Sequence, residues 1–199
     1  MLRGFMMRQQ QGLTLIEMMI AMVIGIIISG AVITVFISNI KSSTDNMKMA
    51  RLNQELRGVM TFISDEIKRA GYSSDSTNSA FNDEFNFAAG SNCLRYSYDE
   101  NGDGTLDADE RFGFQLNTNI LRWSNNVTTT DCSDGTWQNI TDTGIATITA
   151  FTITEAPIGA GTININHLNV SLTGQINLTP NIATRTITEI VRVRNEDAS

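Results

Sequence analysis

The sequence predicts an α+β fold in which one long N-terminal helix packs on a C-terminal antiparallel β-sheet. Two observations predict it. An uncharged apolar run near the N-terminus continues without a break into a stretch whose apolar residues recur at helical spacing. The rest of the chain contains short runs rich in Thr, Ile and Val, which favour strands. We therefore expect the helix over residues 13–71 and a β-rich globular body over residues 72–199.

The composition excludes several classes of protein. The chain has 199 residues, with 14 Lys and Arg against 21 Asp and Glu, so its formal net charge is −7. An acidic chain is poorly suited to bind the phosphates of nucleic acids, and we expect no direct nucleic-acid binding. Apolar residues make up 41% of the chain and Pro occurs only twice, a balance typical of a globular body and not of a disordered tail.

The first half of the helix is predicted to span a membrane. Residues 18–38 contain no charged side chain, and at about 1.5 Å per residue they form a helix roughly 31 Å long, enough to cross the hydrocarbon core. Arg3 and Arg8 precede this run with no acid among them, which favours a cytoplasmic N-terminus and a body on the opposite, periplasmic side. A cleaved secretory signal is the alternative, but residues 26–31 offer only a weak small-residue cleavage site.

The second half of the helix is amphipathic. Its apolar positions recur at steps of three and four, while charged residues occupy the other faces. We expect this stripe to pack on the body's own sheet, with a groove for a partner helix as the alternative. Gly71 follows Lys68 and Arg69 and is expected to end the helix. The stripe consists of Leu52, Leu56, Val59, Met60, Ile63 and Ile67.

Six runs are expected to form the strands of the body. They cover residues 94–98, 111–116, 120–123, 145–154, 163–172 and 184–193. Asn117, Thr118 and Asn119 lie between two of these runs and predict a hairpin turn.

Residues 12–17 resemble the processing site of type IV prepilins, in which Gly and an apolar residue precede Thr-Leu-Ile-Glu at the start of an apolar helix. The resemblance implies a cytoplasmic leader over residues 1–12, cleavage after Gly12 by a prepilin peptidase, and methylation of the new amino terminus on Leu13. It also implies that Glu17 pairs with the terminal amine of a neighbouring subunit. Leu13 departs from the usual Phe, and Thr34 stands where many major pilins carry Pro.

The position of Glu17 at the start of the apolar run favours the same pairing. A carboxylate near the end of a membrane-spanning helix costs free energy and tends to have a cationic partner. The alternative is that Glu17 lies at headgroup depth or in the first helical turn, where the helix dipole stabilises an acid.

Residues 65–72 resemble a segment of the PilW family of minor pilins and, more loosely, of the J-type minor pseudopilins of type II secretion, and residues 190–195 resemble the last strand of the PilW family. Both resemblances imply a pilin-like fold. The resemblance to the PilW family implies assembly from the inner membrane into a pilus fibre that supports adhesion and twitching motility. The implied partners are other minor pilins, the major pilin, a large tip adhesin and the prepilin peptidase. A membrane-anchored adhesive module is a further alternative, with Trp123 and Trp137 as its candidate aromatic patch.

Residues 99–110 match the calcium-loop pattern of an EF-hand. A hard cation takes six or more oxygen ligands, and Gly104 supplies the sharp turn. Because the flanking runs alternate like strands, we expect a structural Ca²⁺ at the tip of a hairpin, with a solvated turn as the alternative. The expected ligands are Asp99, Asn101, Asp103, Thr105 (through its carbonyl), Asp107 and Glu110.

Cys93 and Cys132 are the only cysteines. In an oxidising periplasm we expect them to form a disulfide, and two free buried thiols are the alternative. His167 is the only histidine, and with both cysteines expected in a disulfide we expect no Ser-His-Asp or Cys-His set and no zinc cluster; no phosphate loop occurs. We therefore expect no enzymatic activity.

Overall fold

The computed structural model describes residues 12, 14–75, 77–78, 80–83, 86–87, 92–155 and 167–193. It divides the chain into two compact units, residues 1–44 and 45–199, and each unit is described by itself. Helix α1, Leu15–Arg69, contributes to both units.

In the first unit, α1 is long and apolar enough to cross a membrane, as predicted. Its large apolar side chains are exposed, with Ile24 and Phe36 as examples. Two hydroxyl groups in this stretch bond to carbonyls of the helix itself. Ser29 Oγ donates to the Gly25 carbonyl at 2.7 Å, and Thr34 Oγ1 donates to the Gly30 carbonyl at 2.9 Å. Thr34 therefore sits in a regular helix, where a Pro would remove a backbone hydrogen bond.

In the second unit, the remainder of α1 carries the predicted apolar stripe. All six of its residues are buried, which confirms the prediction from their spacing. Helix α1 ends at Arg69, and Gly71 adopts a φ of 77°, the left-handed conformation that glycine tolerates best after a helix. The Gly71 N–H donates to the Ser97 carbonyl at 2.8 Å, so the helix end is tied to a strand.

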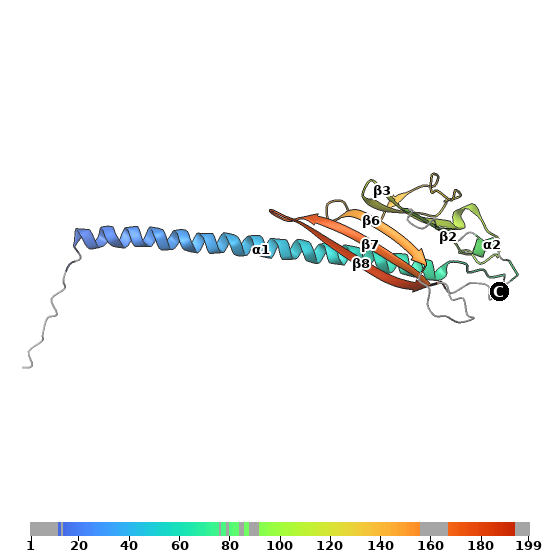
Figure 1. Ribbon diagram of the computed structural model, residues 1–199, viewed down its shortest axis with the longest axis horizontal. Helices are drawn as coiled ribbons and strands as arrows, with labels where there is room; N and C mark the ends of the chain where they lie inside the picture. The colour runs from blue at the N-terminus through green and yellow to red at the C-terminus, as the bar shows by residue number, and fades with distance from the viewer. Residues whose placement is uncertain are drawn as a thin grey trace, which may run out of the picture. The chain divides into compact units, whose positions relative to one another are not determined.

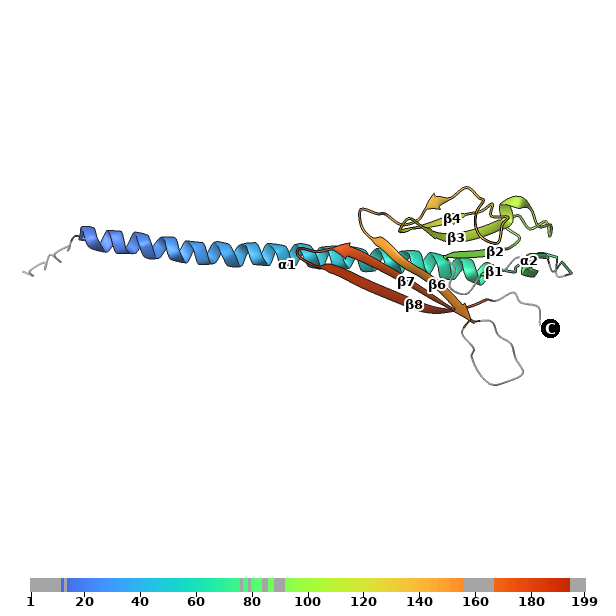
Figure 2. The same cartoon turned by 45° about the horizontal axis from the view of Figure 1, so that its top comes forward.

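Five strands form the first sheet, in the order β1-β2-β3-β4-β5, with every pair antiparallel (Figure 2). The predicted turn between β3 and β4 is confirmed. Thr118 and Asn119 have φ values of 51° and 62°, as a two-residue type I′ hairpin requires. The strands are β1 (Asn86–Phe87), β2 (Cys93–Ser97), β3 (Arg111–Asn117), β4 (Ile120–Ser124) and β5 (Gln138–Asn139); helix α2 (Ala80–Asp83) and the 3-10 helix η1 (Ala108–Glu110) lie in the connections.

Three longer strands form a second antiparallel sheet, in the order β6-β7-β8 (Figure 1). They are β6 (Thr147–Glu155), β7 (His167–Asn177) and β8 (Ile182–Arg192). Strand β7 extends beyond the predicted end at residue 172, and residues 163–166 of that predicted run lie outside the described residues. The α+β class is thus confirmed, but two sheets are present where the pattern predicted one.

The second half of α1 packs against both sheets (Figures 1 and 2). One hydrophobic core contains its stripe together with Phe112 and Phe114 from the first sheet and Phe151 and Leu172 from the second. One close approach is at Gly174 in β7. A Cβ atom added there would lie 2.9 Å from Cδ2 of Leu56 and 3.2 Å from Cδ1 of Leu52. The missing side chain of Gly174 is therefore what lets α1 reach the sheet.

We predict that Gly174→Ala destabilises the protein by about 1–3 kcal/mol, because the added methyl group overpacks a buried contact. Gly58→Ala is the matched control. Gly58 lies on the exposed face of α1 with no atom within 4 Å of an added Cβ, so alanine should stabilise the helix by about 0.5–1 kcal/mol. Thermal unfolding of the full chain in detergent measures both changes, and equal shifts for the two variants would contradict the close contact.

Candidate functional site: the N-terminal segment, the acidic loop and the α1 groove

The residues expected to be processed lie just before α1. Gly12 is exposed and outside the helix, while residues 1–11 and Leu13 lie outside the described residues. Thr14 and Glu17 form the start of the helix together. The Thr14 N–H and its hydroxyl donate to Glu17 Oε2 at 2.8 and 2.7 Å, and the Glu17 N–H donates to Thr14 Oγ1 at 3.4 Å. This reciprocal arrangement is a capping box, which satisfies backbone donors that a helix start leaves unpaired.

The capping box uses only one oxygen of Glu17. Both bonds from Thr14 end on Oε2, and within the described residues Oε1 has no partner. Glu17 therefore lies in the first helical turn. The capping box leaves one carboxylate oxygen able to accept a further donor.

The acidic loop, residues 99–110, connects β2 and β3 at the tip of a hairpin, and Ser97 pairs with Arg111 at its base. Strands therefore flank it, as predicted. Asp99 organises the first part of the loop. Its Oδ1 accepts the Gly102 N–H at 2.7 Å, and its Oδ2 accepts the Gly104 N–H at 3.0 Å and the Ser74 N–H at 2.9 Å. Hydrogen bonds from Ser74, above all from its hydroxyl group, lower the pKa of Asp99 to about 2. Burial of the carboxylate opposes this shift but does not outweigh it.

Glu110 closes the other end of the same loop. Its Oε1 accepts the N–H groups of Glu100 and Asn101 at 2.9 and 3.3 Å, and its Oε2 accepts the Asp107 N–H at 3.1 Å. Both end carboxylates thus point inward and are bound to backbone donors. Within the described residues, no three or more His, Cys, Asp or Glu side chains are gathered into a group that could hold a metal ion.

The predicted disulfide between Cys93 and Cys132 is present, with the two Cα atoms 6.1 Å apart. It links β2 to the segment that follows β4 and lies in a small second core with Val127, against which Trp137 packs. Asp134 holds this segment in place. Its carboxylate accepts hydrogen bonds from Thr128 and Thr129. Burial raises the pKa of this carboxylate, but the hydrogen bonds outweigh burial and keep the pKa well below the usual range.

The two tryptophans do not form one exposed patch. Trp123 packs on the main core and stacks on Phe112 with ring centroids 6.0 Å apart, and its Nε1–H donates to the Tyr96 hydroxyl at 3.1 Å. Trp137 packs on the second core and donates to the Asp134 carbonyl. Each indole is used within the body, which does not favour an adhesive aromatic platform.

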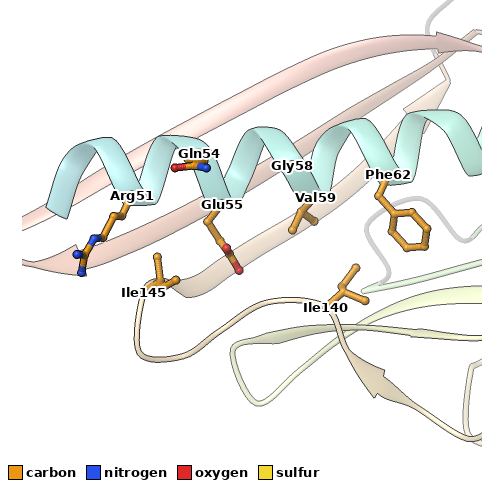
Figure 3. A pocket seen from close by; sticks show the side chains of 8 residues that line it. All are labelled: Arg51, Gln54, Glu55, Gly58, Val59, Phe62, Ile140 and Ile145. Carbon is orange, nitrogen blue, oxygen red and sulfur yellow. The ribbon is translucent and has the colours of Figure 1, made fainter. Parts of the chain in front are cut away.

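A groove of about 510 Å³ lies between α1 and the segment that follows β5 (Figure 3). The Asp142 N–H donates to Glu55 Oε1 at 2.9 Å and so fixes that segment to the helix. Phe62 is 37% exposed at the groove and makes edge-on contacts with the rings of Phe114 and Trp123. We call this surface the α1 groove; its lining residues are Arg51, Gln54, Glu55, Gly58, Val59, Phe62, Ile140 and Ile145.

Two known protein families match this chain. The family described as prepilin peptidase-dependent protein B matches residues 45–193. The chain belongs to this family. The prokaryotic N-terminal methylation motif also matches, over residues 7–33, which include Gly12, Leu13 and Glu17. No curated protein and no solved structure matches the chain.

The two matches identify a type IV pilin-like protein whose apolar helix and prepilin motif suit an anchor in the inner membrane. Dependence on a prepilin peptidase connects this member of the family to the machinery that handles pilins. Pilin families are structural components of filaments, in agreement with the expectation that the chain has no enzymatic role.

Sequence reasoning missed several residues of this pilin-like protein. Ser74 lies 25 residues before Asp99 in the chain, and nothing in the local pattern connects them. Asn78 likewise donates to the Gly104 carbonyl at 2.6 Å and brings a separate segment onto the acidic loop. The α1 groove was also missed, because Ile140 and Ile145 are isolated apolar residues in a polar segment.

The lowered pKa of Asp99 predicts an acid-dependent loss of stability. A carboxylate with a folded pKa of about 2 against an ordinary 3.8 stabilises the fold above about pH 4, and this contribution disappears as the pH falls through 2. The melting temperature of Asp99→Asn should therefore lie below that of the unchanged chain at pH 5, and the gap should close by about pH 2. Thermal melts with a chelator present measure it.

Asp109→Asn is the control for this prediction, because it removes a charge from the same loop at an exposed residue. Its melting temperature should follow the unchanged chain across the whole range. A gap for Asp99→Asn that stays constant from pH 5 to pH 2 would mean that ionisation of Asp99 does not stabilise the fold.

Proposed function

We propose that this protein is a minor pilin of a type IV pilus, similar to PilW. It is inserted in the inner membrane as a precursor, cleaved after Gly12 and methylated on Leu13, and its helix then enters a fibre beside the helices of other subunits. The observation that carries the proposal is the position of Glu17. It is the only charged residue between Arg8 and Lys41, at the start of an apolar helix that carries the methylation motif.

The unpartnered oxygen of Glu17 supports this role. The capping box keeps Oε2 on Thr14, while Oε1 has no donor within the described residues. Cleavage after Gly12 would create an ammonium group on Leu13 of every subunit. An ammonium from a neighbouring subunit would neutralise Glu17 in an apolar environment, where an unpaired charge is expensive.

The body would supply recognition. In the proposal it meets other minor pilins, the major pilin and a large tip adhesin, and the assembled fibre supports adhesion and twitching motility. The α1 groove supports such contacts, because it offers exposed apolar surface from Phe62 beside the charged side chains of Arg51 and Glu55.

A minor pseudopilin of type II secretion is the second candidate. It is favoured by the same N-terminal motif and by the looser resemblance to J-type pseudopilins, since both systems use a methylated apolar helix. The two candidates differ in what the cell loses without the protein.

We predict that a deletion strain loses piliation and twitching, and that the unchanged gene restores both while Glu17→Ala does not. The reason is that an uncharged side chain cannot pair with a neighbour's terminal amine. Piliation is measured by electron microscopy of sheared fibres. Intact-mass analysis of the membrane form should give a chain that begins at Leu13 and carries one extra methyl group, in the Glu17→Ala strain as in the complemented one.

The processed mass separates failure of assembly from failure of insertion. Normal twitching with trapped exoprotein would support the pseudopilin instead of the pilin. A chain that still begins at Met1, or fibres that incorporate Glu17→Ala as well as the unchanged subunit, would contradict the proposed function itself.

We also propose that the acidic loop binds Ca²⁺ as a structural ion. Six of its twelve residues are acids, so a bound cation would relieve their mutual repulsion. The inward-facing Asp99 and Glu110 already close both ends of the loop. Binding would exchange some of their bonds to backbone N–H groups for bonds to the ion. The remaining oxygens would come from Asn101, Asp103, Asp107 and the Thr105 carbonyl.

We predict that Ca²⁺ at about 10 mM stabilises the full chain by about 2 kcal/mol, as a site of submillimolar affinity would. Asp103→Ala should remove this effect because it deletes a ligand, whereas Asp109→Asn should keep it because that position supplies none. Differential scanning calorimetry with and without Ca²⁺ gives the shift. Equal melting temperatures for the unchanged chain in Ca²⁺ and in chelator would exclude the site.

A further inference from the structure

Strand β8 is an open edge of the second sheet. It pairs with β7 over eleven consecutive positions without a register shift, and among the described residues no strand pairs with its other side (Figure 1). Its sequence, IATRTITEIVR, contains no Pro or Gly, and Ile182 and Ile190 are 63% and 56% exposed. Edges of this length usually carry a Pro, a bulge or a cover, because free backbone groups recruit another strand.

The charges on β8 are arranged symmetrically about Ile187. Arg185 lies two residues before it and Glu189 two residues after it, and Thr186 and Thr188 are its immediate neighbours. Arg185 and Glu189 are exposed and, within the described residues, form no ion pair. Both share a strand face with Ile187, since side chains alternate along a strand.

This symmetry makes β8 complementary to itself in one register. If a second copy of β8 is placed antiparallel with Ile187 opposite Ile187, each Arg185 faces the Glu189 of the other copy. Opposite charges at directly facing positions stabilise an antiparallel pair, and like charges destabilise it. On the other face, Ile190 of each strand lies diagonal to Ile182 of the other, so the exposed isoleucines come within reach of one another.

We propose that β8 pairs with β8 of a second copy of this chain and joins the two three-stranded sheets into one antiparallel six-stranded sheet. The register is fixed by two Arg185–Glu189 pairs. The pairing uses only groups of β8 and is a contact between bodies, separate from the packing of the apolar helices.

Purified full-length protein in detergent micelles tests the pairing through energy transfer between two batches of the chain, one labelled with a donor dye and the other with an acceptor dye. The unchanged chain should show energy transfer. Arg185→Glu and Glu189→Arg should each weaken the association about tenfold, because each variant places like charges opposite one another at both pairs. One variant mixed with the other should associate again, since the acidic strand then faces the basic one.

Arg192→Glu is the matched control, because it makes the same charge change as Arg185→Glu at a position that faces Ile182 in the proposed register. It should associate like the unchanged chain. Full association of both single variants, loss of association in Arg192→Glu, or no rescue in the mixture would overturn the register. An unchanged chain that does not associate would overturn self-pairing and leave the edge to a strand of another protein. None of these outcomes bears on filament assembly.

Discussion

Burial of the α1 stripe is the constraint on which the body depends. A helix with an apolar face gains stability mainly from tertiary packing, and each large aliphatic side chain removed from water contributes about 1.5–3 kcal/mol. Neither sheet covers the stripe alone. The core that holds Leu56 and Ile63 also includes Leu94 and Phe114 of the first sheet and Val170 of the second. One helix therefore joins both sheets in a single core, and the sheets also contact each other directly where β6 meets β3 and β4.

A buried acid helps to fix how the first sheet meets this helix. Glu66 is 7% exposed, and both of its oxygens are used. Oε1 pairs with Arg69 at 3.1 Å, and Oε2 accepts the hydroxyls of Tyr96 at 2.9 Å and Tyr98 at 3.3 Å. Burial is the main cause that raises the pKa of both tyrosines, and the negative charge of Glu66 is the next. Both hydroxyl groups therefore remain protonated and can donate. Such a network is tolerated because every member has a partner.

The parts of the fold that sequence predicts well are those encoded locally. The α1 stripe follows from the 3.6-residue period, and the end at Gly71 follows from the conformational freedom of glycine. The turn at Thr118 and Asn119 follows from its position between two alternating runs, although Thr is an unusual residue for a positive φ. In these cases a short segment carries the physical signal.

The parts that sequence did not predict depend on partners distant in the chain. The alternation within a strand gives its faces but not its neighbours, so one expected sheet proved to be two. Strand β5 has only two residues and no pattern of its own. The same reason applies to the candidate site. The loop that starts at Asp99 was visible as a motif, whereas the bond from Ser74 and the groove at Phe62 exist only after folding.

Glu17 and Glu66 lie on the same helix and show two different solutions for an acid in apolar surroundings. Both oxygens of Glu66 have donors within the fold, which are Arg69 of the same helix, Tyr96 of β2 and Tyr98, the residue after β2. The fold alone therefore satisfies this acid. Glu17 has donors from Thr14 on one oxygen, and within the described residues the other oxygen has none. A carboxylate left partly unpaired in an apolar environment is costly. In the proposed function, an amine of another molecule would remove this cost.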